Sequence, residues 1–389
     1  MSEWKEYKLG EIADVRDGTH DSPKESNNGF PLVTSKNIKN GKIDLSNTYL
    51  ISKSDYEFVN KRSKVDKWDI LFSMIGTIGE CAIVKQQPEY AIKNVGLFKT
   101  HGDELLAYWI YYYIHSQQAK SEMRACIKGS TQQYISLTDL RNFPIELPIK
   151  EKQLEIVSIL SSLDDKIDLL HRENKTLEAM AETLFRQWFI EEAKEDWEEN
   201  PLGKCIKLVG GGTPKTSEER FWNGSVFWLS GGDIANNHKS FVFSSEKSIS
   251  EDGLNNSSAK LLPENAMVIS ARGTVGKYCL LSKPMAFSQS NYGILPIYND
   301  CYFFTYLLVA YHIDELQSAA YGSVFDTITT KTFEGVSVLI PKETSYIVEF
   351  EKMIEPYFSK MKQNNKQIQT LIQQRDSLLP KLMSGEVKI

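Results

Sequence analysis

The residues of this 389-residue chain that could do chemistry are concentrated in short glycine-rich turns. Ser73–Gly79 and Ser270–Gly276 share the pattern Ser-x-x-Gly-Thr-[Ile/Val]-Gly. Glycine permits positive φ angles and threonine bonds turn backbone, so the pattern has a structural explanation. The same turns would also bring backbone N–H groups, and the guanidinium of Arg272, close to a phosphate. Both interpretations stay open on the residues alone.

Asparagine, glutamine, threonine and lysine recur at matched loop positions in the two halves of the chain. Asn and Gln read adenine with two hydrogen bonds in the major groove of DNA, and Lys or Arg contacts guanine or phosphate. This enrichment favours a DNA-binding face built from loops. Its candidate residues are Thr19, Lys36, Asn37, Thr77, Lys93, Asn94, Thr131, Gln132, Gln133, Thr213, Lys215, Arg272, Thr274, Gln289, Ser290 and Asn291.

The sequence shows no pattern of a catalytic or metal site. The six histidines lack metal-ligand spacing and the five cysteines form no Cys-x-x-Cys pair, so neither a zinc site nor a disulfide framework is predicted. Gly273–Lys277 resembles a phosphate-binding loop, but Tyr278 stands where Mg²⁺ binding needs Ser or Thr. We expect a chain that catalyses nothing and holds no metal or cofactor of its own.

The composition is that of an ordinary globular protein, with 41% hydrophobic and 25% charged residues. The most apolar runs, residues 105–114 and 302–313, are about half the ~20 residues that a membrane span needs. The first ten residues lack the apolar core of a secretory signal. We therefore expect a cytoplasmic protein with reduced cysteines and no membrane partner.

The net charge of −6 is unevenly distributed along the chain. Residues 1–149 carry a net charge of 0, residues 150–200 carry −7, residues 201–341 carry −1 and residues 342–389 carry +2. A strongly basic domain would be typical of a nucleic-acid-binding protein. A neutral domain still has room for a basic face, so the charge weakens the case for DNA binding without excluding it.

The chain repeats itself with a period of about 193–197 residues, which indicates a duplication. The matched landmarks, in order, are Leu9-Gly10 with Leu202-Gly203, Gly18-Thr19 with Gly212-Thr213, Leu32–Ile38 with Trp228–Ile234, Ser73–Gly79 with Ser270–Gly276, Asn94–Gly96 with Asn291–Gly293, Gly129-Ser130 with Gly322-Ser323, and Leu147-Pro148 with Ile340-Pro341.

Each copy begins with a block of mixed secondary structure and ends in a helical segment. Short apolar runs such as Asp69–Ser73 and Ala266–Ser270 predict strands, and the aromatic-rich runs Leu105–Gln118 and Tyr302–Leu316 predict helices. The expected organisation is therefore α+β. It comprises a domain at residues 1–149, a helical spacer at 150–200, a second domain at 201–341, and a second helix with a tail at 342–389.

Both helical segments carry hydrophobic residues in alternating steps of four and three, the spacing of a coiled-coil seam. The stripe positions are Leu163, Ile167, Leu170, Asn174, Leu177, Ala181, Leu184 and Trp188 in the first segment, and Phe350, Ile354, Tyr357, Met361, Asn364, Ile368, Leu371, Arg375, Leu378 and Leu382 in the second.

No Gly or Pro interrupts Gln153–Glu199, and the segment from about Leu154 to Trp188 is predicted to form one long helix of about 40 residues, which would span roughly 60 Å. Because the second helix must return the chain, we expect an antiparallel pair with one domain at each end, a pseudo-twofold dumbbell. Asn174 and Asn364 each occupy a stripe position. A buried Asn fixes the register of a coiled coil, and a surface position would tolerate it equally.

Two helical blocks resemble conserved regions of the specificity subunits of type I restriction-modification systems. Residues 177–189, LEAMAETLFRQWF, are similar to the central region, and residues 378–386, LLPKLMSGE, to the terminal one. Gly211–Pro214 and the Gly-Thr-[Ile/Val]-Gly turns are similar to the family's target-recognition domains. The resemblance covers the whole chain, although Asp17–His20 departs from the Gly-Gly-Thr-Pro pattern of Gly211–Pro214.

The resemblance implies a non-catalytic subunit whose two domains each recognise one half of a split, asymmetric site in double-stranded DNA. It implies that the paired helices set the spacing of the halves and bind two methyltransferase subunits, which methylate adenine with S-adenosylmethionine. Two restriction subunits that use ATP and Mg²⁺ would complete the assembly. The residues expected to pair the helices or bind the methyltransferase are Leu163, Ile167, Leu170, Asn174, Leu177, Leu184, Trp188, Ile354, Met361, Asn364, Ile368, Leu371, Leu378 and Leu382.

The alternative is an interaction scaffold whose domains bind only proteins. Salt-dependent DNA binding would separate the two functions, because neutralising phosphates releases counterions.

Overall fold

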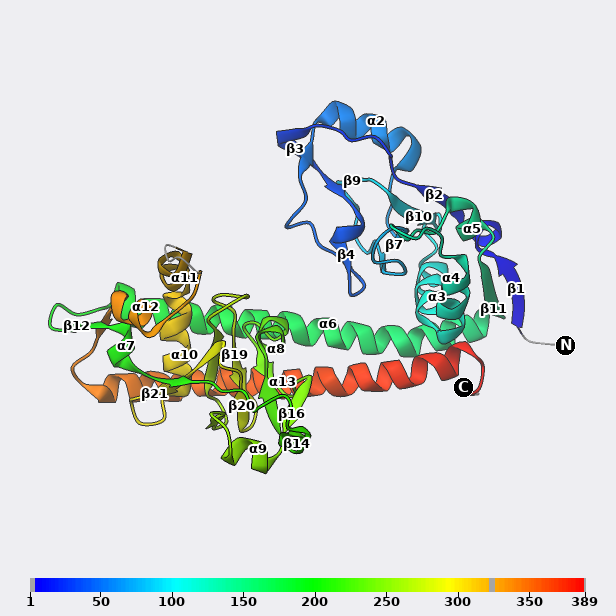
Figure 1. The fold of residues 1–389 in the computed structure, drawn as a ribbon. Coiled ribbons are helices and arrows are strands. Elements are labelled where there is room, and N and C mark those ends of the chain that lie inside the picture. The colour runs from blue at the N-terminus through cyan, green and yellow to red at the C-terminus, as the bar shows by residue number, and fades with distance from the viewer. Residues whose placement is uncertain (1–3, 322–325, 388–389) are drawn as a thin grey trace. The chain divides into compact units, whose positions relative to one another are not determined.

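The computed structural model describes residues 4–321 and 326–387, which divide into two compact units (Figure 1). Unit 1 comprises Met1–Lys166 and Leu371–Ile389, and unit 2 comprises Ile167–Thr370. Gly322-Ser323, the second copy of one repeated landmark, lies outside the described residues. Among the described helices, none combines the length and apolarity that crossing a membrane requires.

The first domain, in unit 1, contains two main sheets. The larger has the order β2-β10-β7-β8 and is antiparallel throughout, and the smaller has the order β6-β3-β9, with β3 and β9 parallel. The strands are β2 Asp14–Asp17, β3 Glu25–Val33, β6 Leu50–Ile51, β7 Ile70–Ser73, β8 Cys81–Ile83, β9 Ala91–Ile92 and β10 Val95–Lys99. Smaller pairs join β1 Trp4–Lys8 to β11 Pro144–Pro148, and β4 Ile38–Lys39 to β5 Lys42–Ile43.

The second domain, in unit 2, repeats this topology. Its sheets have the orders β13-β21-β18-β19-β15 and β16-β14-β20-β17, and its β12–β22 pair corresponds to β1–β11. The strands are β12 Glu198–Pro201, β13 Ile206–Gly210, β14 Trp222–Leu229, β15 Phe241–Val242, β16 Lys247–Ile249, β17 Leu261–Leu262, β18 Met267–Ser270, β19 Tyr278–Leu281, β20 Met285–Phe287, β21 Asn291–Pro296 and β22 Ser337–Ile340.

The duplication is confirmed at the level of individual strand pairs. The parallel pair β3–β9 aligns Leu32 with Ala91, and the parallel pair β14–β20 aligns Trp228 with Ala286. The antiparallel pairs β3–β6 and β14–β16 each contain an irregularity in register. Strands β15 and β17 have no counterpart in the two main sheets described for the first domain.

The two aromatic-rich runs predicted to be helical are helical, with one correction, and the domains contain further helices that were not predicted. The two aromatic-rich runs were each expected to form one helix, but each is divided in two. The first breaks at Ser116, whose side chain accepts a hydrogen bond from Ala119 N at 3.1 Å and so begins a new helix. The second breaks at His312. The helices are α1 Leu9–Ile12, α2 Lys53–Ser63, α3 Glu104–His115, α4 Gln117–Cys126, α5 Leu137–Arg141, α7 Leu202–Cys205, α8 Gly231–Asn236, α9 Glu251–Asn255, α10 Tyr302–Tyr311, α11 Ile313–Tyr321 and α12 Thr330–Gly335.

The two long helices are α6, Lys150–Arg186, and α13, Thr344–Met383. A π-helical turn at Gln187–Glu191 follows α6, so the helical region ends close to the predicted Trp188 and does not fill the whole spacer at 150–200. Acidic residues follow that turn, and negative charge is unfavourable at a helix C-terminus. Beyond it the backbone is bonded in the pair β12–β22 instead.

Within each unit these helices pack against each other and against the domain core. In unit 2, ring centroids are 6.1 Å apart for Phe185 and Phe350, and 4.9 Å for Trp188 and Tyr346. The residue number falls on α13 as it rises on α6, so the pair is antiparallel. In unit 1 the core likewise joins Leu160 of α6 to Leu379 of α13.

Every predicted stripe position of the pairing set is buried or half-buried. This placement fits helix pairing. Two further residues, Phe185 of α6 and Phe189 of the π-helical turn that follows it, are almost fully buried although they lie outside the predicted stripe. Their burial comes from the domain core, since both rings contact Phe304 of α10.

Candidate nucleic-acid interface

The glycine-rich turns after β7 and β18 have the same backbone form. Their four glycines have φ angles between 76° and 98°, which confirms the predicted positive φ. Each turn is closed by a matching backbone bond, from Ser73 N to Glu80 O at 2.8 Å in the first domain and from Ser270 N to Lys277 O at 2.7 Å in the second. The turns are therefore rigid platforms whose exposed side chains point from a fixed backbone.

The threonines of these turns bind neighbouring polar groups. Thr274 Oγ1 lies 2.9 Å from Ser270 Oγ and 3.3 Å from the carbonyl oxygen of Gly231 at the beginning of α8. In the first domain, Thr77 Oγ1 lies 3.4 Å from Ser73 Oγ. Thr77 is exposed, while Thr274 is half-buried. Thr274 thus joins the glycine-rich turn to the beginning of α8, and the exposed Thr77 is freer to contact a ligand.

Strand register brings most candidate loops of the first domain to one edge of its sheet. Asp17 pairs with Gly96, and Ser73 pairs with Val95, so the end of β2, the end of β7 and the beginning of β10 meet there. An isolated bridge between Ile75 and Tyr134 brings the loop at 129–134 to the same edge. In the second domain, the pairing of Ser270 with Asn291 repeats this arrangement.

Two candidate asparagines are used inside the fold. Asn37 is 6% exposed, its Oδ1 accepts a hydrogen bond from Thr34 N at 2.9 Å, and its Nδ2 donates to Asp44 O at 3.1 Å. Asn291 is 1% exposed, and its Nδ2 donates to Ser288 Oγ at 2.8 Å. These positions favour structural roles over DNA contact, because neither amide faces solvent.

The loops after β2 and β13 approach the sheet closely. A Cβ on Gly18 would lie 2.6 Å from the carbonyl oxygen of Ile92, so only glycine fits there. The next residue, Thr19, bridges to Lys93, whose ammonium bonds Ser22. In the second domain, Thr213 contacts the exposed side chain of Gln289.

Half of the candidate DNA-binding side chains are exposed. These are Lys36, Thr77, Thr131, Gln132, Gln133, Lys215, Arg272 and Gln289. The half-buried candidates are Thr19, Lys93, Asn94, Thr213, Thr274 and Ser290. They stay candidates for DNA contact.

The structure adds residues at this edge that the sequence analysis missed. Tyr134 is 43% exposed beside the 131–133 loop. Arg62, on α2, donates a hydrogen bond to Asp17 at the end of β2. The two residues are 45 positions apart, so no local sequence pattern predicts this contact. His20 contacts both Asp17 and Asn94. The only feature of the sequence that pointed to His20 was that it stands at the position of Pro214 in the second domain.

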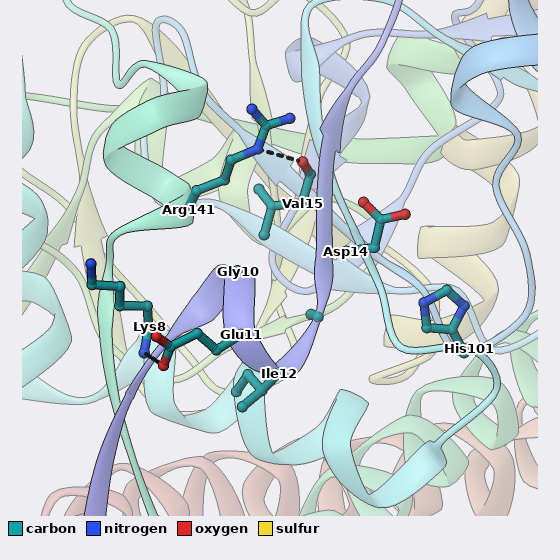
Figure 2. A pocket seen from close by; sticks show the side chains of 9 residues that line it. Lys8, Gly10, Glu11, Ile12, Asp14, Val15, His101 and Arg141 are labelled. Carbon is teal, nitrogen blue, oxygen red and sulfur yellow. Dashed lines mark hydrogen bonds between the residues drawn. The ribbon is translucent and has the colours of Figure 1, made fainter.

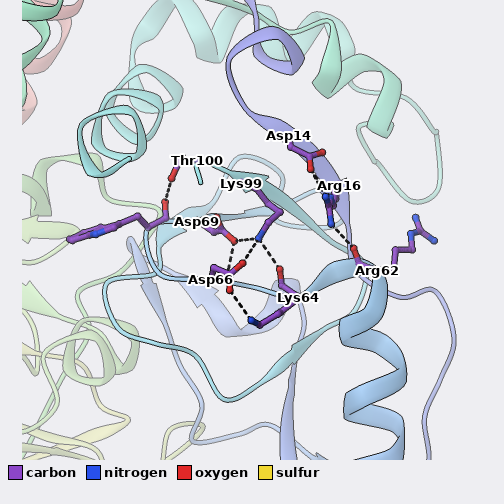
Figure 3. A network of polar contacts seen from close by, with 9 residues as sticks. Asp14, Arg16, Arg62, Lys64, Asp66, Asp69, Lys99 and Thr100 are labelled. Atoms are coloured by element: carbon purple, nitrogen blue, oxygen red, sulfur yellow. Dashed lines mark hydrogen bonds and ion pairs between the residues drawn. The ribbon is translucent and has the colours of Figure 1, made fainter. Parts of the chain in front are cut away.

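A buried ion network lies at the opposite end of β2 and β10 (Figure 3). Lys99 Nζ lies 2.7 Å from Asp69 Oδ2 and 2.8 Å from Asp66 Oδ2, and it also donates to the carbonyl oxygen of Lys64. Burial alone would lower the pKa of Lys99, but its hydrogen bonds to the two carboxylates raise it. The network is structural, because the ammonium of Lys99 is bonded to two carboxylates and a carbonyl oxygen of the same domain, although the second oxygen of Asp69 is buried without a hydrogen-bond partner.

A cavity of about 630 Å³ also lies at that end, around α1 (Figure 2). Arg141 spans part of it and donates from Nε to Val15 O at 3.2 Å. Since Asp14 lines this cavity while Asp17 meets the candidate loops, the cavity is separate from the interface. Among the described residues, no cluster of three or more His, Cys, Asp or Glu could hold a metal ion.

Comparison with known proteins identifies the family. A family model described as "Type I restriction modification DNA specificity domain" matches residues 1–179 and again residues 194–373. The type I restriction enzyme MjaIX specificity subunit of Methanocaldococcus jannaschii is 24% identical over 419 residues, covering 100% of this chain and 94% of the relative. The HindI specificity subunit of Haemophilus influenzae is 24% identical over 473 residues, covering both chains completely.

A solved structure has the same fold. The crystal structure of the type I restriction-modification system S subunit from M. genitalium superimposes with a TM-score of 0.60 at 17% identity, covering 97% of this chain and 96% of the other. The duplicated domains, the long helices and the double family match agree with one another, so the chain belongs to the family of type I restriction-modification DNA specificity domains.

Proposed function

We propose that this chain is the DNA sequence-recognition subunit of a type I restriction-modification complex, in which residues 1–149 and 201–341 each read one half of a bipartite, asymmetric site. The observation that carries the proposal is the duplicated sheet edge. Each domain presents a rigid glycine-rich turn, and this turn and its neighbouring loops carry exposed polar side chains, such as Thr77 and Gln132 in the first domain and Arg272 and Gln289 in the second. Such loops suit DNA reading, since phosphate contacts set position and base contacts specify sequence.

The two half-sites should differ because the two edges differ in charge. The turn of the second domain carries Arg272 and Lys277, both exposed, where the first domain has Ile75 and Glu80. The second domain therefore offers cations to phosphate or guanine where the first does not. An asymmetric site follows from this difference.

The helices α6 and α13 would hold the spacing of the half-sites and bind two methyltransferase subunits. The net charge of −7 on residues 150–200 is a poor match to DNA, so the outer face of α6 suits a protein partner. The partners would methylate adenine at N6 with S-adenosylmethionine, and two restriction subunits would use ATP and Mg²⁺. This chain would contribute recognition in the cytoplasm and no catalytic group.

The proposal is tested by co-expressing the chain with its cognate methyltransferase subunit and mapping N6-methyladenine across the host DNA. We expect methylation confined to one bipartite motif with two different halves. Methylation without a defined motif, or with a single uninterrupted motif, would overturn the proposal. Expression of the methyltransferase subunit alone is the control and should leave that motif unmethylated.

A further inference from the structure

His20 lies between a buried carboxylate and a candidate base-reading amide in the first domain. Its ring Nε2 is 2.9 Å from Asp17 Oδ2, and its Nδ1 is 2.8 Å from Asn94 Oδ1. Backbone bonds hold the partners in place, because Thr19 N donates to Ile92 O at 3.0 Å and Asn94 N donates to Thr19 O at 3.1 Å. These backbone bonds therefore place Asp17 and Asn94 within reach of the exposed ring of His20.

The carboxylate of Asp17 is fixed in position by burial and by a second hydrogen-bond partner. Its side chain is 8% exposed, and its other oxygen accepts a hydrogen bond from the guanidinium of Arg62. An ionised carboxylate only accepts, so the Nε2 of His20 must carry a proton in this contact. The variable site on the ring is Nδ1, which faces Asn94.

The proton on Nδ1 determines how the amide of Asn94 is presented. When His20 is charged, both ring nitrogens donate, Asn94 Oδ1 accepts, and Asn94 Nδ2 is turned outward. When His20 is neutral, Nδ1 has a lone pair, so the amide must rotate by about half a turn to donate Nδ2 to it, which turns Oδ1 outward. The rotation needs no backbone movement, because the backbone of Asn94 is bonded through its own N–H to Thr19 O at 3.1 Å and the amide turns about a side-chain bond.

We propose that His20 is the positioning residue that sets the hydrogen-bonding polarity of Asn94 toward DNA, and hence one base preference of the first half-site. This inference rests on the proposed function. With Nδ2 outward, Asn94 favours base acceptors such as guanine O6 or thymine O4. With Oδ1 outward, it favours donors such as the amino groups of cytosine or adenine.

This arrangement of His20 between Asp17 and Asn94 occurs in the first domain and is not repeated in the second. The second domain has Pro214 at the position of His20, and the corresponding Asn291 is buried and bonded to Ser288. The charged groups on elements packed around His20 are Asp17 on β2, Arg62 on α2 and Lys93 in the turn before β10. Because Asp17 and Arg62 oppose each other in charge, the proton on His20 changes the net charge of the cluster as well as the polarity of Asn94.

The test uses the chain in complex with its methyltransferase partner and a duplex carrying the motif mapped by methylation. Each position of the half-site read by residues 1–149 is replaced by all four base pairs, and binding is measured by fluorescence anisotropy at about pH 6 and about pH 8.5, which span the range where histidine changes charge. We expect the preference at one position to change at least about five-fold between the two pH values.

Three variants separate positioning from a structural role. His20→Ala should lose the pH-dependent preference, whereas His20→Arg should keep the low-pH preference at both pH values, because arginine stays charged and only donates. His101→Ala, at an exposed histidine of the same domain, should behave as the wild type. The side chain of His20 is 67% exposed, so equal thermal melting of the variants is expected.

The second half-site, measured in the same samples, should show no change of preference with pH. A wild-type preference that is independent of pH, or a pH-dependent preference that survives in His20→Ala, would overturn the inference while leaving the proposed function intact. Failure of the proposed function is distinguishable, because then no bipartite motif would be mapped at all.

Discussion

At the scale of residues, the first domain contains a buried cation that its counterpart lacks. Lys99 and Asp69 form an ion pair in which the side chains are 9% and 0% exposed. The second domain has Pro296 and Ala266 at the corresponding positions, so it needs no buried charge there. Such a pair adds little over an apolar replacement of both partners, yet breaking it leaves an uncompensated charge.

Replacing Lys99 with Met should therefore destabilise the first domain strongly. Asp69 would remain buried without a cation, and the free energy of unfolding should fall by about 3–5 kcal/mol. Urea denaturation followed by tryptophan fluorescence measures this loss. Lys64→Met is the matched control, because the side chain of Lys64 is 62% exposed and its ion pair with Asp66 should contribute less than about 1 kcal/mol. Equal effects of the two variants would show that burial does not govern this pair.

At the scale of elements, the polar residues within the hydrophobic seam between α6 and α13 form a connected hydrogen-bond network. Asn364 is fully buried, and its Nδ2 lies 2.9 Å from both Asn174 Oδ1 and Glu173 Oε2. Asn174 Nδ2 in turn donates to Asn365 Oδ1 at 2.7 Å. A shift of α6 against α13 would separate these amides and bury them unpaired, which costs more than shifting an apolar seam. The burial of Asn364 thus favours the register interpretation of this position over a surface one.

Helix α6 also carries a carboxyl that makes stability depend on pH. Burial raises the pKa of Glu178 to about 7, against an ordinary value of 4.5. Between these values the folded protein keeps the proton while the unfolded chain releases it, so stability falls as the pH rises from about 4.5 to about 7. Denaturant titrations at several pH values across this window should show a shallower decline for Glu178→Gln than for the wild type.

The control for this measurement is Glu334→Gln, which removes an exposed carboxyl and should keep the wild-type slope. Glu351 has its pKa raised to about 7 by burial in the same unit, so part of the decline should remain in Glu178→Gln. Identical slopes for the wild type and Glu178→Gln would rule out a contribution from this carboxyl.

At the scale of the whole molecule, duplication predicts that the two reading functions are separable. Replacing residues 1–149 with the corresponding domain of a relative should change one half of the methylated motif and leave the other half unchanged, because each domain has its own sheets and loops. Sequencing of methylated DNA from cells expressing the exchanged chain and the methyltransferase partner measures this. A motif altered in both halves would mean that the domains do not read independently.

The charge distribution fits a chain that reads DNA within a larger assembly. Both domains are close to neutral, so the isolated chain should bind its site weakly at physiological salt, with the methyltransferase partners supplying much of the positive surface. Nanomolar binding by the isolated chain would contradict this interpretation.

Local and repeated features could be read directly from the residues. The duplication, the antiparallel helix pair, the buried strands before the glycine-rich turns and the positive φ of those glycines all follow from short-range periodicity or from backbone sterics. Each depends on residues a few positions apart, or on a match between two copies of the same pattern. For that reason the sequence alone determined the two domains, the long helices and the loops that carry the candidate interface.

Tertiary structure decided what depends on contacts between distant residues. Pairing of β12 with β22 ends the helical region before Glu199, and packing turns Asn37 and Asn291 inward although their residue type suggested DNA contact. The cluster of Asp17, His20 and Arg62 forms only when β2 and α2 meet across 45 residues. Such contacts depend on strand register and on burial in the folded protein, and neither can be predicted from the spacing of residues along the chain.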